Sequence, residues 1–212
     1  IAELADQLVS LRKQHGGKAF AYYGGGGQGN HLPGVFSSAF KAALGTRFHY
    51  SALAQEKTGD FWVNGELFGR QTSHITDDVE AADYVLFVGT NPWQAHGFPR
   101  ARKVLQEIQK DPQRTMVVID PRRTETAELA DVHLQLKPGT DAYLLSALIA
   151  VIVTEGLEDR EFLGERAAGF DAVRETFAAV PVERYCEIAG VDPEVVREVA
   201  RGLAAAQAAT VR

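Results

Sequence analysis

Two short apolar runs constrain the fold more than any other feature of this sequence. Residues 84–88 (YVLFV) and 115–119 (TMVVI) are almost wholly apolar, which is typical of strands buried on both faces of a sheet. Between them, residues 98–110 place Val104 and Ile108 on one face of an amphipathic helix. A strand, a helix and a second buried strand make a βαβ unit, so this pattern predicts a parallel sheet.

The remaining segments continue the alternation of strands and helices. We therefore predict an α/β fold: a Rossmann-like parallel sheet with helices on both faces and a helical C-terminal segment. The pattern predicts strands at 18–23 (a buried one), 46–51 and 133–136, helices at 1–14, 31–44, 125–130 and 141–155, an irregular stretch at 55–76, and helices alone at 160–207.

Composition excludes several classes of function. With 22 Lys and Arg against 28 Asp and Glu, the chain lacks the positive charge that nucleic-acid binding requires. The longest apolar run, 142–153, is too short to cross a bilayer, so we expect no membrane contact and a cytoplasmic location. The single cysteine, Cys186, excludes an internal disulfide and an iron–sulfur cluster held by this chain alone, and we expect it to serve in packing.

Polar and glycine-rich motifs follow three of the predicted strands. Ligands of open parallel sheets bind beyond the carboxyl ends of the strands, where glycine turns and helix N-termini accept phosphates. Glycine lets the backbone approach a ligand, a carboxylate suits a ribose hydroxyl or a purine amine, and arginine suits phosphate. The three motifs are Gly89-Thr90-Asn91-Pro92, Asp120-Pro121-Arg122-Arg123-Thr124 and Pro138-Gly139-Thr140-Asp141. Their recurrence favours a nucleotide-like ligand.

Each motif also has a purely structural interpretation. Gly89 to Pro92 has the composition of an ordinary loop, Asp120-Pro121 that of a plain turn, and Thr140-Asp141 that of a helix cap. A separate alternative is dinucleotide binding at the glycine-rich turn 24–29, which fits G-x-G-x-x-G. The acidic residue expected about 20 residues further on is not evident there.

Taken together, the motifs resemble those of a known family. Residues 85–108 (VLFVGTNPWQAHGFPRARKVLQEI) and 117–163 carry G-x-N-P, D-P-R-x-T-x-T-A-x-x-A-D and P-G-[ST]-D in succession. This combination resembles the molybdopterin oxidoreductases, the family of formate dehydrogenases, nitrate reductases and dimethyl sulfoxide reductases. Formate-dehydrogenase-like members are the most similar.

The resemblance implies a cofactor and the residues that bind it. The cofactor would be molybdopterin guanine dinucleotide carrying molybdenum or tungsten. Range 51–212 would be the Rossmann-like domain that binds it, with a helical tail, and range 1–50 a partial α/β domain containing the glycine turn. The motif positions carried over as cofactor contacts are Gly89, Thr90, Asn91, Asp120, Pro121, Arg122, Thr124, Gly139, Thr140 and Asp141.

The resemblance also indicates what this chain does not supply. Because the chain begins at Ile1 rather than Met, we expect a segment of a longer oxidoreductase that is inactive in isolation. Its partners would be the rest of the parent chain, with a 4Fe–4S cluster in an N-terminal part, and an electron-transfer subunit. Gln55 and Glu56 stand where the family has its protein ligand to the metal, although neither is the usual ligand. The alternative is a non-catalytic nucleotide-binding or assembly module of the same fold.

Overall fold

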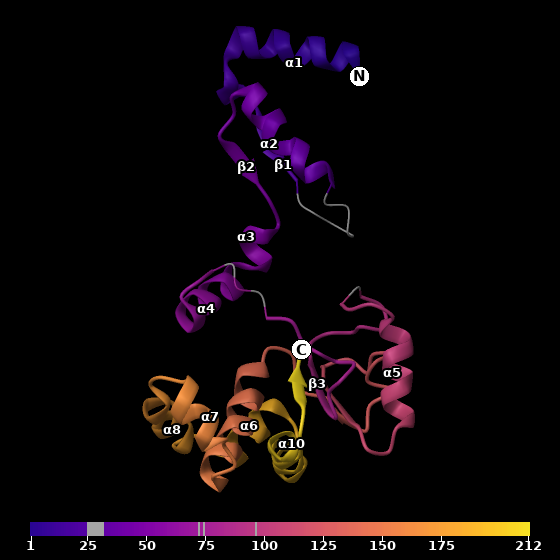
Figure 1. Ribbon diagram of the computed structural model, residues 1–212, viewed down its shortest axis with the longest axis vertical. Coiled ribbons are helices and arrows are strands. Elements are labelled where there is room, and N and C mark those ends of the chain that lie inside the picture. Colours follow the sequence, from indigo (N-terminus) through magenta and orange to yellow (C-terminus); the bar gives the residue numbers. More distant parts are fainter. Residues whose placement is uncertain (25–31, 72, 74, 96) are drawn as a thin grey trace. The chain divides into compact units, whose positions relative to one another are not determined.

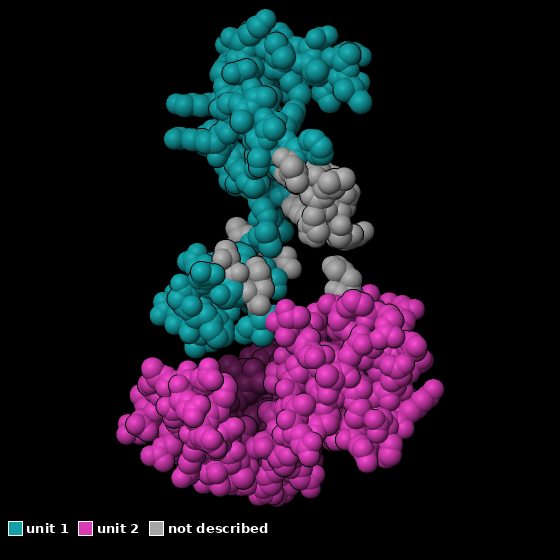
Figure 2. All heavy atoms as spheres, viewed as in Figure 1, with its two compact units in different colours: residues 1–75 teal, residues 76–212 magenta. Residues whose placement is uncertain are grey.

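The computed structural model describes residues 1–24, 32–71, 73, 75–95 and 97–212. The chain forms two compact units, Ile1–Ile75 and Thr76–Arg212, which Figure 2 shows in different colours. From the sequence we predict a domain boundary after Tyr50. In the structure the two units divide after Ile75, so the helices between Tyr50 and Ile75 belong to unit 1. The roles predicted for ranges 1–50 and 51–212 stay predictions. Most of the glycine-rich turn, residues 25–29, lies outside the described residues.

Unit 1 begins with two helices and two short parallel strands. Its elements are α1 (Ala2–His15), a 3₁₀ turn at Gly17–Ala19, β1 (Ala21–Tyr23), α2 (Leu32–Leu44) and β2 (Phe48–Tyr50). The strand predicted at 18–23 is confirmed only for its second half, Ala21–Tyr23, and its predicted burial is wrong, because Tyr23 is 76% exposed. Among the described residues β1 pairs only with β2, so its apolar side chains lack the two covering layers that a central strand has.

The irregular stretch predicted at 55–76 is also wrong in part. Residues Leu53–Glu56 form α3 and Thr58–Phe68 form α4, which ends at Gly69 with a left-handed φ of 66°. Gly59 and Gly65 lie within α4 and weaken its helical pattern, and Trp62 is 64% exposed. A glycine-containing helix without a consistent apolar face gives little periodicity to detect.

Unit 2 contains the predicted parallel sheet. Its strands are β3 (Tyr84–Val88), β4 (Thr115–Ile119), β5 (Val132–Leu134) and β6 (Ala209–Val211), in the order β5-β4-β3-β6. Each neighbouring pair is parallel, with Val88 opposite Ile119 and Ile119 opposite Leu134. All four strands therefore end at the same edge of the sheet, and β6 points to the C-terminus in Figure 1.

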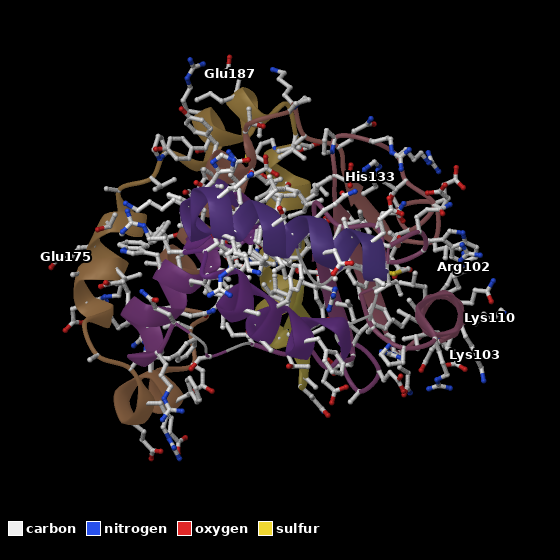
Figure 3. The ribbon with its side chains drawn as sticks, turned by 90° about the horizontal axis from the view of Figure 1, so that it is seen from above. Arg102, Lys103, Lys110, His133, Glu175 and Glu187 are labelled. Carbon is white, nitrogen blue, oxygen red and sulfur yellow. The ribbon has the colours of Figure 1, made fainter. Side chains whose placement is uncertain are left out.

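Helices cover both faces of this sheet, as predicted. Alternate residues of β3 and β4, such as Phe87 and Val118, pack against α5 (Ala101–Lys110). The residues between them pack against α6 (Asp141–Glu155), α9 (Val182–Ala189) and α10 (Pro193–Ala205). Figure 1 shows α5 on one side of the sheet and α6 and α10 on the other, with α7 (Arg160–Arg166) and α8 (Phe170–Ala178) further out. The polar face of α5 carries Arg102, Lys103 and Lys110, which point away from the sheet (Figure 3).

Three local predictions in unit 2 need correction. Residues 125–129 form hydrogen-bonded turns instead of the predicted helix: the Glu128 N–H bonds to Thr124 O four residues back, but the next bonds, such as Leu129 N–H to Thr126 O, span only three residues. Helix α5 begins later than predicted because Arg100 adopts a left-handed φ of 55°. Strand β6 was missed, since its alanine-rich approach has the composition of a helix.

The prediction that no apolar segment is long enough to cross a bilayer can be compared with the helices of the structure. Within the described ranges, no helix has both the length and the apolar character that a bilayer span requires.

Candidate cofactor-binding site

The register of the sheet brings the first two motifs together. Gly89 and Asp120 each follow the paired residues Val88 and Ile119, and neighbouring strands lie about 4.8 Å apart. Gly89 N–H donates to Ile119 O at 2.8 Å, which extends the ladder to the edge of the sheet. The loop after β3 and the loop after β4 therefore leave the sheet side by side.

Two glycines at this edge combine a special backbone conformation with open space. Gly89 has a φ of +61° and Gly139 a φ of +80°, and a Cβ added to either would meet no atom within 4 Å. Other residues rarely adopt these angles, so the backbone itself requires glycine. The empty space beside each glycine would let a ligand approach the main chain closely.

Asp120 is the buried carboxylate of the site. It is 9% exposed, and its Oδ1 accepts the Arg122 N–H at 2.7 Å. Among the described residues, its Oδ2 accepts no hydrogen bond. Its backbone carbonyl is 2.9 Å from His133 Nε2, and that contact ties the start of the loop to β5. One oxygen of a fixed carboxylate is thus left for a ligand.

Asn91 connects the two loops. Its Nδ2 donates to Glu125 Oε2 at 2.8 Å, and its Oδ1 accepts the Thr126 hydroxyl at 2.7 Å. Thr126 is fully buried and also accepts the Trp93 N–H at 3.2 Å. The half-buried Asn91 is therefore a bridge between the loops, and its predicted contact with a cofactor stays a prediction. Thr90 beside it is likewise half-buried.

The remaining residues of the second motif differ in exposure. Pro121 is exposed and its carbonyl accepts from Gln135 Nε2 at 3.0 Å. The Arg122 side chain is 71% exposed, and its Nη2 is 3.8 Å from Glu125 Oε2. Thr124 is only 3% exposed, and its hydroxyl accepts the Ala127 N–H at 3.1 Å. Most of the Arg122 side chain is thus accessible to a ligand, while Thr124 shapes the turn.

The third motif forms the turn into α6. Lys137 N–H donates to Ala189 O at 2.8 Å, which fixes this turn to the end of α9. Thr140 occupies the N-cap position but makes no side-chain cap bond, and its hydroxyl donates to Lys137 O at 2.6 Å. Asp141 is the half-buried first residue of α6. The N–H groups of the first turn face out of the helix end, as in every α-helix.

Sequence reasoning missed the residues that hold the loops in place. Glu125 accepts from two side-chain amides, and its pKa is lowered by its own backbone N–H and by Asn91 and Gln94. His133 and Gln135 of the β5 segment anchor the backbone at Asp120 and Pro121. The second threonine of the D-P-R-x-T-x-T-A motif was a signal for Thr126. No sequence signal singled out His133.

The remaining candidates lie elsewhere. Gln55 and Glu56 are on α3 of unit 1, where Gln55 is exposed and only the backbone of Glu56 is described. Within the described ranges, no group of three or more His, Cys, Asp or Glu side chains could hold a metal ion. Cys186 is fully buried in the core beside α6, and burial raises the pKa of its thiol. Its predicted packing role is confirmed.

Comparison with known proteins identifies the family. The profile of the molybdopterin oxidoreductases matches residues 1–200. The chain is 38% identical over 143 residues to the F420-dependent formate dehydrogenase alpha subunit of Methanocaldococcus jannaschii, covering 68% of this chain and 21% of that protein. It is 28% identical over 211 residues to formate dehydrogenase H of Escherichia coli, covering 98% of this chain and 29% of that protein.

The fold agrees with that of a solved structure. Acetylene hydratase from Pelobacter acetylenicus superposes with a TM-score of 0.74 at 25% identity, over 99% of this chain and 28% of that one. The chain thus spans between a fifth and a third of the length of these relatives. Because the family model matches residues 1–200, the chain belongs to the molybdopterin oxidoreductase family.

Proposed function

We propose that this chain binds the guanine dinucleotide part of a molybdopterin cofactor in a molybdenum or tungsten oxidoreductase. One observation carries the proposal: the parallel order β5-β4-β3 gathers three polar loops at one edge. Gly89 and Gly139 leave open space there, and Asp120 presents a carboxylate oxygen. These residues fit a ligand with phosphates and hydrogen-bond donors, which is the chemistry of a nucleotide.

The distribution of charge suggests how the nucleotide lies. Arg122 offers a planar donor fork to phosphate, and the backbone at Gly89 allows a close approach beside it. Asp141 puts a carboxylate at the start of α6, which opposes phosphate there and suits the N–H donors of guanine. Asp120 directly follows β4, the strand between β3 and β5, and it suits the guanosine portion. The guanine would therefore lie towards Gly139-Thr140-Asp141 and the phosphates towards Gly89 and Arg122.

The other predicted contacts support this arrangement in different ways. Pro121 is exposed while Thr90 and Asn91 are half-buried, and the hydroxyl of the buried Thr124 accepts the Ala127 N–H within the turn that follows Arg122. When bound, the cofactor supplies two-electron redox chemistry at its metal, while this chain binds and orients it. Gln55 and Glu56 remain candidates for a role near that metal.

The parent protein is proposed by analogy to the relatives. Identity of 38% to a formate dehydrogenase subunit favours a formate-dehydrogenase-like enzyme. The iron–sulfur cluster and an electron-transfer subunit would then be contributed outside this chain, with the assembly in the cytoplasm. We expect the 212-residue chain alone to show no turnover. Formate oxidation by this chain with about one molybdenum bound would contradict that expectation.

Nucleotide titration tests the proposal directly. Isothermal titration calorimetry of the 212-residue chain with GDP, ADP and NADH should show GDP as the tightest ligand, because guanine offers a carboxylate two adjacent N–H donors, at N1 and N2, whereas adenine offers only its amine. GDP stands for the guanosine and phosphate portion of the cofactor. Tighter NADH binding would instead favour the glycine-rich turn at 24–29 as a dinucleotide site. Equal binding of GDP and ADP would remove the guanine assignment.

A further inference from the structure

Glu125 lies at the centre of the contacts between the two loops. Its Oε2 accepts from Asn91 Nδ2 at 2.8 Å and its Oε1 accepts from Gln94 Nε2 at 3.0 Å. Both amides belong to the loop after β3, whereas Glu125 belongs to the turn after β4. The carboxylate is thus held at both oxygens by the neighbouring loop.

This arrangement fixes orientation as well as position. An ionised carboxylate only accepts hydrogen bonds, so both amides must turn their nitrogens towards it. Asn91 then directs its Oδ1 at the buried Thr126 hydroxyl, 2.7 Å away. Hydrogen bonds from its own backbone N–H, Asn91 and Gln94 lower the pKa of Glu125 and keep it ionised. A charged group therefore has a defined place at the rim of the site.

Arg122 is the cation closest to that charge on the same turn. Its Nη2 is 3.8 Å from Glu125 Oε2, and its side chain is otherwise 71% exposed. A long arginine side chain loses much rotamer freedom when a ligand fixes it. A carboxylate at this distance favours the guanidinium positions near it, and any rotamer freedom that Arg122 gives up in the free protein is not lost again when the guanidinium meets a phosphate.

We propose that Glu125 is a positioning residue that holds Arg122 in the direction of the nucleotide phosphate. The inference rests on the proposed function and deepens it. Gln94 and Asn91 fix Glu125, Glu125 restrains Arg122, and Arg122 binds the phosphate. Glu125 itself does not touch the ligand. A carboxylate beside a phosphate site also repels the phosphate. Loss of the Glu125 charge should therefore weaken GDP binding if Glu125 positions Arg122, and strengthen it if repulsion dominates.

A double-mutant cycle on GDP binding tests this role. The variants are Glu125→Gln, Arg122→Ala and both together, with the dissociation constant for GDP measured by calorimetry on the 212-residue chain. Glu125→Gln removes the charge and one of the two amide bonds, and it should weaken binding about fivefold, the effect of ordering one flexible side chain. With Ala at position 122, the same change should alter the constant by less than about twofold, because its target is gone.

Two further variants separate this role from general damage to the turn. Glu128→Gln makes the same chemical change three residues on, at an exposed side chain, and should leave GDP binding unchanged. Gln94→Ala removes one of the bonds that fix Glu125 and should weaken GDP binding about twofold. Melting temperatures of all variants show whether the fold is retained.

The outcomes distinguish the two proposals. An unmodified chain that does not bind GDP would overturn the proposed function and the inference with it. If GDP binds and Arg122→Ala weakens it, unchanged or tighter binding in Glu125→Gln overturns the positioning role alone. A fivefold loss that persists in the double variant would also overturn it, because Glu125 would then act without Arg122.

Discussion

Replacement of Gly89 by alanine separates backbone strain from contact with a ligand. The residue has a φ of +61°, and its added Cβ would meet nothing within 4 Å. Alanine at this angle costs about 1–2 kcal/mol from the left-handed conformation alone. There is no steric clash in the free protein, so Gly89→Ala should fold with a melting temperature lower by roughly 2–8 °C.

Gly169 provides a matched control. It precedes α8 with a φ of +79°, and a Cβ added there also meets nothing within 4 Å. Gly169→Ala should therefore lower the melting temperature by a similar amount. Gly169 lies outside the three proposed binding loops, so this variant carries the strain without the obstruction.

Nucleotide affinity is the measurement that decides. If the phosphates of GDP approach the backbone at Gly89, a methyl group there should weaken binding at least tenfold, or about 1.4 kcal/mol. Gly169→Ala should bind GDP as the unmodified chain does. Calorimetric titration together with thermal melts gives both quantities for each variant. Equal GDP affinities for the two variants would refute the placement of the phosphates beside Gly89.

The other predictions concern charge and burial. Asp120→Asn keeps an acceptor for the Arg122 N–H but loses the charge, so calorimetry should show GDP binding weakened roughly tenfold to a hundredfold. Cys186→Ser should leave GDP binding unchanged. Normal GDP affinity in the Asp120 variant would contradict the role of Asp120. Burial, and then the nearby Asp131, raise the pKa of Tyr84 to about 12. The contribution of the neutral Tyr84 phenol to the free energy of unfolding is therefore fully present below the unfolded pKa of 10.0 and is lost as the pH rises through about 12. Ultraviolet titration should show this phenol ionising last, and ionisation near 10 would argue against its burial. The Arg201 hydrogen bond lowers the pKa of Glu155, so the stabilisation from the ionised Glu155 is present above about pH 4.5 and is lost as the pH falls further. The melting temperature of Glu155→Gln should depend less on pH between about 5 and 3 than that of the unmodified chain. Identical pH dependence would count against the ion pair.

The central βαβ unit could be predicted because its signals are local. Tyr84–Val88 and Thr115–Ile119 are buried strands as predicted, and α6 spans the predicted Asp141–Glu155. In each case a run of apolar residues is buried throughout or on one face, so the hydrophobic pattern and the structure carry the same information. The strand ends followed from this, since parallel strands share one edge.

Strand β6 shows why other parts could not be predicted. It contains only Ala209–Val211, too few residues for a periodic signal. Its place depends on Asp83, whose carboxylate accepts the N–H groups of Gln207 and Ala208 at 3.1 and 3.0 Å. Asp83 N–H donates in turn to Ala208 O at 2.9 Å. These partners are more than 120 residues apart in sequence, and no local pattern reports such a contact.

Some polar residues of the strand-end motifs fix the loops and others are open to a ligand, and the residue types alone do not distinguish the two. Asn91, Thr124 and Thr126 direct their polar atoms at other groups of the protein, and a buried polar atom without a partner would destabilise the loops. Arg122, Gly89 and one oxygen of Asp120 remain open instead. A loop that must present a few groups accurately needs others that fix its own backbone. Substitution of Thr126 should therefore impair nucleotide binding by displacing the loops. Substitution of Arg122 should impair it by removing a direct contact with the nucleotide.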